Sequence, residues 1–382
     1  MRVQIVDVPA WTPPYDHALC AALAGAGASV ELVTTEFPFG PVPFGGGYAV
    51  SKRFYRQSAR LYARGVHAGR ATQSARRAVK LAEHVPDMLR HGRHARAADV
   101  VHYQWLTFPA LDVHLLPRTR PRVLTAHNVP LREPRWGELG ALRRLLRCMD
   151  AVVVHSEHGA RRLRDELAAP PEIVHVIPHG AFDYLTRLPG EVPLPGELEN
   201  VDRPVVLFFG LIRAYKGLDV LLEAFASVPD AELWVIGLPR LPLEPFERLA
   251  RRAPGRVRFI SRYVADVEIP AFFRRADLVV LPYREIDQSG VLHAALAFGK
   301  PLVLSRIGGF IDVSDEHRAA RLVEPGDAAE LAAALRDLLG DPAERRRLAA
   351  AAAAAAAGPY SWDNVAQRTL RLYQDLLRSV PD

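Results

Sequence analysis

A buried strand, a basic loop and a helix follow one another directly in residues 205–225, VVLFFGLIRAYKGLDVLLEAF. The β-branched and aromatic run VVLFF is typical of a strand that is buried on both faces of a parallel sheet. Gly210 ends this strand, and LDVLLEAF carries apolar residues at helical spacing. The order predicts an open α/β sheet, a fold that binds ligands at the carboxyl ends of its strands.

The loop of this segment carries two cations, Arg213 and Lys216, beside Gly217. Cations held at the carboxyl end of a strand suit a phosphate group. A solvated basic loop is the alternative interpretation of the same residues.

A second strand–loop–helix segment lies in residues 277–310, DLVVLPYREIDQSGVLHAALAFGKPLVLSRIGGF. An apolar strand over 278–281 and a polar loop lead to Ser289-Gly290, which opens an apolar helix that Gly299 closes. The first N–H groups of such a helix, together with its dipole, attract an anion. Ser289 could instead be an ordinary N-cap, but two such sites in one βαβ series favour a diphosphate ligand.

The remaining sequence divides into two α/β halves. The first half has short predicted strands at 3–8, 29–35, 99–104, 122–127, 151–156 and 173–180, and the second at 205–210, 232–237, 256–261, 277–283 and 301–305. Residues 188–204 are rich in proline, glycine and acid, which predicts an interdomain linker. A length of 382 residues, 49% of them hydrophobic, is enough for two cores.

The chain resembles glycosyltransferase family 4, of the glycosyltransferase group 1 type. The resemblance rests on FFGLIRAYKGLDVLLEAF, VIPHG at 176–180, HSEHGARRL at 155–163, SGVLHAALAFGKPLVLSRIGGF and SWDNVAQRTLRLYQDLL at 361–377. It implies the GT-B fold, in which two Rossmann-like domains face each other across a cleft. The implied domains are an acceptor-side domain over 1–187, the linker 188–204 and a sugar-nucleotide domain over 205–360, with 361–382 crossing back to the first domain.

The resemblance also implies an activity, namely a retaining hexosyltransferase that uses a nucleoside diphosphate sugar. The acceptor would be a glycan, a lipid-linked sugar or a small molecule, and the pathway cell-envelope or polysaccharide biosynthesis. The expected catalytic residues are His127, Arg213, Lys216 and Asp287. The expected donor-binding residues are Gly210, Tyr263, Glu285, Gln288, Ser289, Gly290 and Val291. No cofactor and no obligatory metal are expected, because the cations take the metal's place, and no residue cluster has metal-ligand spacing.

The chain departs from the family pattern at several positions. Two glutamates eight residues apart are usual there, and Ile286 and Ala294 occupy those positions here, although Glu285 and Asp287 flank the first. The second glutamate typically holds the ribose. Leu211 replaces the usual arginine after the strand glycine, and PAWTPPYDHAL at 9–19 replaces a glycine-rich turn. Two alternatives therefore stay open: a non-catalytic GT-B binding protein and a sugar-nucleotide epimerase of the same fold.

Candidates for the acceptor side lie at strand ends of the first half. His127 ends the strand VLTAH, at a position where the family carries a histidine near the sugar and the acceptor. Tyr15, Asp16 and His17 follow the first strand, and His102, Gln104 and Trp105 end another. A lone histidine is also a common structural residue, so these residues remain candidates for the cleft.

Charge is unevenly distributed. Residues 1–185 hold 24 Lys and Arg against 16 Asp and Glu, and residues 52–96 alone hold 12 against two, with aromatic residues interleaved. This stretch suits an anionic membrane surface, although a solvated helix face would have the same composition. Nucleic acid is not an expected partner, because no nucleic-acid motif accompanies the charge.

Other classes of protein lack support in the sequence. No G-x-G-x-x-G follows the first strand, GGGYAVSK at 45–52 lacks P-loop spacing, and G-x-S-x-G is absent. No signal peptide and no transmembrane run is visible, and Cys20 and Cys148 are predicted to be reduced core thiols. We therefore expect a cytoplasmic protein that can lie peripherally on the inner face of the cell membrane.

Overall fold

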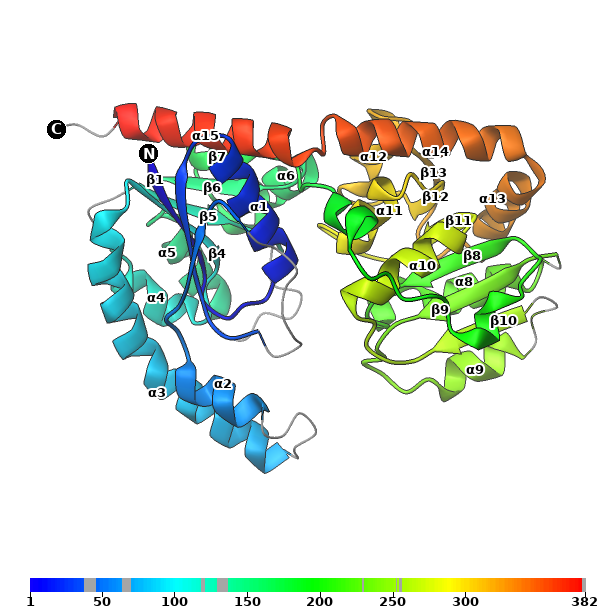
Figure 1. The fold of residues 1–382 in the computed structure, drawn as a ribbon, viewed down its shortest axis with the longest axis horizontal. Helices are drawn as coiled ribbons and strands as arrows, with labels where there is room; N and C mark the ends of the chain where they lie inside the picture. The colour runs from blue at the N-terminus through cyan, green and yellow to red at the C-terminus, as the bar shows by residue number, and fades with distance from the viewer. Residues whose placement is uncertain are drawn as a thin grey trace. The chain divides into compact units, whose positions relative to one another are not determined.

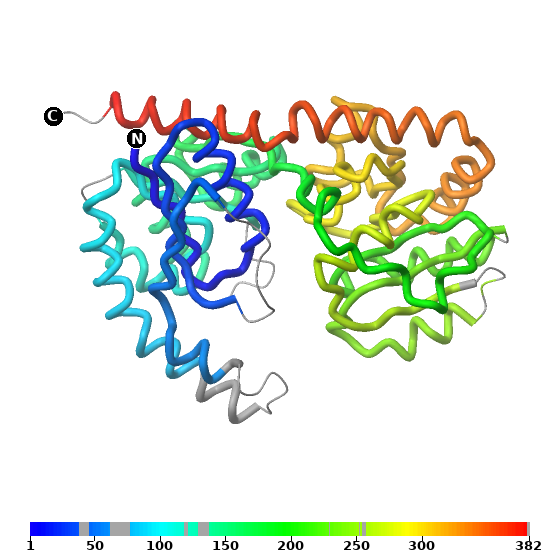
Figure 2. The backbone as a smooth tube through the Cα atoms, in the orientation of Figure 1, coloured from blue at the N-terminus to red at the C-terminus, as the bar shows by residue number. Residues whose placement is uncertain are grey.

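The computed structural model describes the backbone of residues 1–37, 46–63, 70–117, 121–128, 137–228, 230–251, 253 and 256–379 (Figure 1). Side chains are described for these residues except 62, 63, 70–76 and 256 (Figure 2). The chain divides into two compact units. Unit 1 comprises Met1–Gly180 and Trp362–Asp382, and unit 2 comprises Ala181–Ser361.

Unit 1 is built on a seven-stranded parallel sheet with the order β3-β2-β1-β4-β5-β6-β7 (Figure 1). The strands in its middle are buried, as in a sheet covered on both faces, and two of them also bury the polar residues Gln4, Asp7, His102 and Gln104. The strands are β1 (Arg2–Asp7), β2 (Ser29–Thr34), β3 (Ala49–Lys52), β4 (Val100–Trp105), β5 (Arg122–Thr125), β6 (Ala151–Val154) and β7 (Val174–Val176). Since all of them are parallel, their carboxyl ends share one edge of the sheet.

Helices cover both faces of this sheet. On one face, α1 (Pro13–Gly25) and α15 (Trp362–Ser379) lie side by side over a core that includes Leu19, Val365 and Tyr373 (Figure 1). The core of the other face contains Met88, Leu145 and Leu163. Its helices are α3 (Arg70–His94), α4 (Pro109–Leu115), α5 (Glu138–Leu146) and α6 (Glu157–Leu167), and α2 (Arg56–Ala63) packs along α3.

Unit 2 has a six-stranded parallel sheet with the order β10-β9-β8-β11-β12-β13. Its strands are β8 (Val205–Phe209), β9 (Glu232–Ile236), β10 (Arg256–Ile260), β11 (Leu278–Leu281), β12 (Leu302–Ser305) and β13 (Ala320–Val323). One face is covered by α8 (Leu218–Phe225), α9 (Glu244–Ala250) and α13 (Ala328–Gly340). The other is covered by α10 (Ile269–Arg275), α11 (Gly290–Ala297), α12 (Phe310–Asp315) and α14 (Pro342–Ala357).

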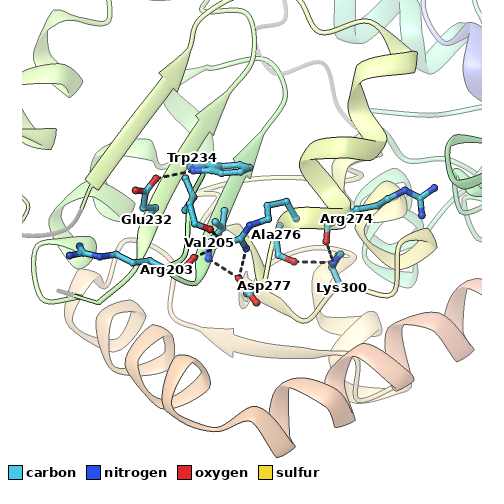
Figure 3. A network of polar contacts seen from close by, with 10 residues as sticks. Arg203, Val205, Glu232, Trp234, Arg274, Ala276, Asp277 and Lys300 are labelled. Atoms are coloured by element: carbon cyan, nitrogen blue, oxygen red, sulfur yellow. Dashed lines mark hydrogen bonds and ion pairs between the residues drawn. The ribbon is translucent and has the colours of Figure 1, made fainter. Parts of the chain in front are cut away.

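A polar network ties the amino ends of the unit 2 strands together (Figure 3). Asp277, just before β11, accepts the backbone N–H of Val205 at 2.8 Å and an Arg275 N–H at 3.1 Å. Lys300, just before β12, donates to the carbonyl oxygens of Arg274 and Ala276 at 2.9 Å each, which satisfies the end of α10. These side chains lie at the edge of the sheet opposite to the carboxyl ends of the strands. We therefore infer that they stabilise the fold and do not bind a ligand.

The predicted strands all form, and the structure adds two. We did not predict β3 and β13, because each strand is only four residues long and includes an exposed charged side chain. The segment 188–204, which we expected to be a linker, lies within unit 2 and contains α7 (Gly196–Glu199). Leu198 is fully buried in the core of unit 2, which explains why this proline-rich segment packs. No helix in the described parts of the chain combines the length and apolarity needed to cross a membrane.

Candidate functional site

The donor-side candidates of unit 2 gather around Gly210 at the carboxyl end of β8. Gly210 has a φ of +95°, and a methyl group at this position would lie 3.1 Å from Nζ of Lys216 and 3.0 Å from Cγ2 of Val291. Gly210 therefore lies close to both the Lys216 ammonium group and a methyl group of Val291 in the first turn of α11. A side chain at position 210 would crowd both groups, so glycine allows this close approach.

Lys216 is held in place from several sides. It ends the short 3₁₀ turn Ala214–Lys216, is 6% exposed, and its Nζ lies 5.1 Å from the centre of the Tyr283 ring. A buried ammonium group is costly without compensating contacts, which the aromatic face supplies in part. Arg213, at the start of the same turn, is exposed, so its longer side chain lies at the rim.

The two predicted anion-binding loops are joined by close backbone contacts. Arg284 donates its N–H to the carbonyl oxygen of Tyr215 at 2.7 Å, and its guanidinium group contacts Asp219 at 2.6 Å. Gly217 has a φ of +67°, and a Cβ there would lie 2.0 Å from the carbonyl oxygen of Pro282. The loop after β8 and the loop after β11 are thus fixed to each other before any ligand binds.

The start of α11 presents the backbone groups that the sequence predicted. Ser289 is the residue before the helix, and its side chain makes no capping hydrogen bond. The first N–H groups of a helix have no partner within that helix, so those of Gly290 and Val291 are suited to an anion. Gly290 also lies against Phe182, since a Cβ on it would come within 3.1 Å of that ring.

The other donor-side candidates occupy the loop before α11 and the end of β10. Glu285 is exposed, whereas Asp287 is 6% exposed, and Gln288 contacts Nε2 of His293 at 2.9 Å. Tyr263, 43% exposed, lies beyond β10, two strands away from β8. The structure therefore brings Gly210, Lys216 and the α11 turn together and places Tyr263 farther along the same edge.

The two positions where the family usually carries glutamates are apolar and buried. Ile286 is 8% exposed and Ala294 is 5% exposed, and both belong to the hydrophobic core of unit 2. The carbonyl oxygen of Ile286 also lies so close to Gly308 that a Cβ there would approach it to 2.2 Å. Neither position offers a carboxylate to a ribose or a sugar.

In unit 1, four neighbouring strands each carry or precede a buried histidine, and three of these histidines lie beyond the carboxyl end of their strand. His102 lies on β4, His127 follows β5, His155 follows β6 and His179 follows β7. All four are at most 7% exposed, and the ring of Tyr15 lies about 5 Å from those of His127, His155 and His179. We predicted His127 and Tyr15 but overlooked His155, which directly follows the apolar strand β6, and His179, which lies three residues beyond β7.

His127 is enclosed by aromatic rings and polar groups. Trp105 stacks on it with ring centres 5.0 Å apart, Nε2 faces Oε1 of Gln104 at 3.0 Å, and Nδ1 faces Nε2 of His155 at 3.2 Å. Burial, followed by the charges of His155 and His102, lowers the pKa of His127 well below the ordinary histidine range. His102 lies deeper, where it contacts Tyr373 and Thr125.

A carboxylate pair and a pocket lie beside α1. Burial and the nearby charge of Asp7 raise the pKa of Asp16 well above its usual value, while Asp7 accepts the backbone N–H groups of Trp11 and Thr12. Asp16 lines a pocket of about 470 Å³ at the ends of β1, β2 and β3, together with His17 and Lys52. Lys52 pairs with Glu36 at 2.8 Å, and burial lowers the pKa of His17 to about 4.

Part of the predicted basic stretch 52–96 is described. Residues 64–69, Arg64 among them, lie outside the described residues, as do the side chains of 62, 63 and 70–76. On α3, Leu81, Val85 and Leu89 are 47%, 37% and 51% exposed, and Arg77 and Arg93 continue the same four-residue spacing at either end. One helix face therefore combines exposed apolar side chains with flanking cations.

Both halves of the chain match models of known families. A model of "Glycosyltransferase Family 4" matches residues 15–181, and one of "Glycosyl transferases group 1" matches residues 203–341. Alpha-maltose-1-phosphate synthase of Mycolicibacterium smegmatis is 30% identical over 315 residues, which cover 73% of this chain and 80% of that protein. The chain belongs to glycosyltransferase family 4.

Other relatives are covered over less of their length. GDP-mannose:glycolipid 4-beta-D-mannosyltransferase of Xanthomonas campestris is 34% identical over 192 residues, 48% of this family 4 chain and 49% of that protein. A D-inositol 3-phosphate glycosyltransferase of Corynebacterium kroppenstedtii is 31% identical over 61% of this chain and 54% of that protein. The chain thus spans about half the length of these curated relatives.

Solved structures agree on the fold. Sucrose-phosphate synthase of Thermosynechococcus elongatus matches with a TM-score of 0.75 and 21% identity over 100% of both chains. HepE of Anabaena, solved in complex with UDP-glucose, matches with a TM-score of 0.70 and 19% identity over 98% of this chain and 100% of that one. The two parallel-sheet Rossmann-like units of this family 4 chain are thus those of a GT-B protein.

Proposed function

We propose that this protein is a retaining glycosyltransferase that moves a hexose from a nucleoside diphosphate sugar to an acceptor. The convergence of Lys216 and the first turn of α11 on Gly210 carries this proposal. When the sugar leaves, negative charge develops on the β-phosphate, and positive groups fixed beforehand stabilise that charge. Lys216 and the α11 N–H groups are so fixed, and Arg213 would reach the phosphates from the rim.

The remaining roles follow from position. Asp287 or Glu285, which flank the position of the family's first glutamate, would supply a carboxylate there, since Ile286 has none. The diphosphate charge is met by cations and backbone N–H groups, so no obligatory metal and no cofactor enter the proposed reaction. Retention at the anomeric carbon is what family membership leads us to expect.

The acceptor side is proposed to lie on unit 1. Among the described residues that line its 470 Å³ pocket, Lys52 is paired with Glu36 and Asp16 is a buried carboxyl group. This lining suits hydroxyl groups better than a phosphate, because a phosphate would meet acidic groups there. We therefore favour a neutral glycan or the sugar of a lipid-linked acceptor, as in cell-envelope or polysaccharide biosynthesis.

A peripheral membrane location is proposed from the face of α3. Exposed leucine and valine side chains flanked by arginines suit the interface of an anionic bilayer. Such a surface would hold the enzyme on the cytoplasmic side of the membrane, beside a lipid-linked acceptor.

Binding of nucleotide sugars tests the proposal first. In a thermal-shift screen of UDP-, GDP- and ADP-sugars, a true donor at 100 times its Kd adds about 2.7 kcal/mol of stability. Donor hydrolysis without acceptor then separates an enzyme from the alternative that the buried Ala294 favours, a non-catalytic binding protein. Product analysis separates transfer from epimerisation. If the protein binds a nucleotide sugar but shows no hydrolysis, transfer or epimerisation, the non-catalytic binding protein is the correct alternative.

A further inference from the structure

We propose that His155 is a positioning residue that fixes His127 as the Nδ1–H tautomer, so that Nε2 of His127 is a hydrogen-bond acceptor. Under the proposed function, His127 then accepts a hydrogen bond from a sugar hydroxyl and does not donate a proton. The assignment of the tautomer itself needs no assumption about the reaction.

The chain of hydrogen bonds starts at a group that can only accept. Nδ1 of His155 lies 3.0 Å from the carbonyl oxygen of Ile177, so this nitrogen must carry the proton. A neutral imidazole has one donor and one acceptor nitrogen, which makes Nε2 of His155 the acceptor. Burial lowers the pKa of His155 to about 4, so its ring is neutral near pH 7.

The assignment passes from His155 to the next ring. Nε2 of His155 lies 3.2 Å from Nδ1 of His127, which must therefore be the donor. His127 is neutral for the same reason as His155, so its Nε2 carries a lone pair. Trp105, stacked on the His127 ring at 15°, and Tyr15, perpendicular to it at 90°, prevent the ring from turning away.

This tautomer requires that the side-chain amide of Gln104 be turned by half a turn. Oε1 of Gln104 lies 3.0 Å from Nε2 of His127, which would set two acceptors against each other, and its amide nitrogen is buried without a hydrogen-bond partner among the described residues. A half-turn of the amide resolves the conflict at His127, because the Gln104 N–H then donates to the lone pair. A sugar hydroxyl that reaches Nε2 would replace this amide, so both groups are donors to the same atom.

The test is the tautomer of His127 in the full-length protein. In ¹⁵N-histidine-labelled protein at pH 7.5, long-range ¹H–¹⁵N spectra should show a protonated Nδ1 and an unprotonated Nε2, with His127→Asn used to assign the signals. An Nε2–H tautomer or an imidazolium ion would overturn the proposal. This readout is independent of glycosyl transfer, so it stands apart from any failure of the proposed function.

Two substitutions of similar chemistry separate positioning from simple packing. In His155→Gln the side-chain carbonyl can reach the place of Nε2 and accept from His127, so the tautomer should persist. In His155→Asn the amide ends near the place of Nδ1, and His127 should shift toward the Nε2–H form. Turnover with the best donor should fall by about tenfold or more in the Asn variant and be largely kept in the Gln variant, at equal folding by circular dichroism. An unchanged His127 tautomer in folded His155→Asn, or loss of the Nδ1–H tautomer in folded His155→Gln, would contradict the role of His155.

Discussion

The proposed nucleotide site of unit 2 differs from the family pattern at two individual residues. Ile286 and Ala294 are buried and apolar where carboxylates are usual, so affinity for the nucleotide must come from other contacts. The structure brings together Gly210, Lys216 and the start of α11, which we propose as the diphosphate contacts. Their contribution does not depend on the ribose hydroxyls.

We therefore predict weak discrimination between ribose and 2′-deoxyribose donors. Because Ala294 cannot hydrogen-bond a hydroxyl, kcat/KM for the two donors should differ by less than about tenfold, the equivalent of roughly one hydrogen bond. The measurement is turnover of matched ribo- and deoxyribonucleotide sugars. A strong preference for ribose would contradict this prediction, and its loss in Asp287→Asn or Glu285→Gln would identify the substitute carboxylate.

At the scale of elements, α3 of unit 1 exposes a row of large apolar side chains that suits contact with another surface. Its apolar residues recur every four positions, so they line one side of the helix, with arginines at both ends. Glu83 and Asp87 are the acidic residues of the stretch 52–96. Asp87 accepts the backbone N–H of Tyr55, and Glu83 accepts those of Gln57 and Ser58. Their negative charge is directed toward the start of α2.

We predict that α3 docks the protein on anionic vesicles. Each basic residue near such a surface contributes about 1 kcal/mol, and salt weakens the attraction. In co-sedimentation at low salt, Arg77→Glu/Arg93→Glu and Leu81→Gln/Leu89→Gln should each bind clearly less than the parent protein. The control is Leu377→Gln, which changes an exposed leucine of α15. Equal binding of all variants, or equal binding to neutral vesicles, would remove α3 as the membrane contact.

Elements with a strong local pattern could be predicted from the sequence, and those without one could not. The segments at 205–225 and 277–310 were predictable because apolar runs, glycines and cations follow one another in a fixed order. The packing of 188–204 was not, because composition gives no sign that Leu198 enters a core. The proximity of Lys216 to α11 was predictable, because both follow strands whose carboxyl ends share one edge of the sheet. The contact between His155 and His127 was not, because it depends on the exact register of neighbouring strands.

Across the whole molecule, histidines are unevenly divided between the units. Unit 2 contains His293 and His317, and the other 12 of the 14 lie in unit 1. Burial lowers the pKa of His102 to about 3 and that of His155 to about 4. Burial raises the pKa values of Asp7 and Asp16, so their protonation stabilises the folded state as the pH falls. This opposes the effect of the buried histidines, which are more numerous.

We predict that unit 1 loses stability before unit 2 as the pH falls. A histidine whose pKa is lowered by folding binds a proton more readily in the unfolded state. As the pH falls from about 6.5 to the folded pKa, the free energy of unfolding therefore decreases. Each such imidazole gives a slope of about 1.4 kcal/mol per pH unit. Hydrogen exchange is measured at pH 7.5 and 5.0 and corrected for intrinsic rates. On going to pH 5.0, peptides of unit 1 should open faster than peptides of unit 2. Equal opening of both units, or earlier opening of unit 2, would contradict the prediction.

The central claim, that Lys216 and α11 form the diphosphate site, is tested most directly by the turnover of Lys216→Met. Lys300→Met is the matched control, since Lys300 bonds backbone carbonyls at the opposite edge of the same sheet. With the best nucleotide sugar as donor, Lys216→Met should keep its fold and lose about 10²-fold or more in kcat, the usual effect of removing a group that stabilises transition-state charge. Lys300→Met should lose stability and keep its turnover. Turnover of folded Lys216→Met at the level of the parent protein would contradict the account.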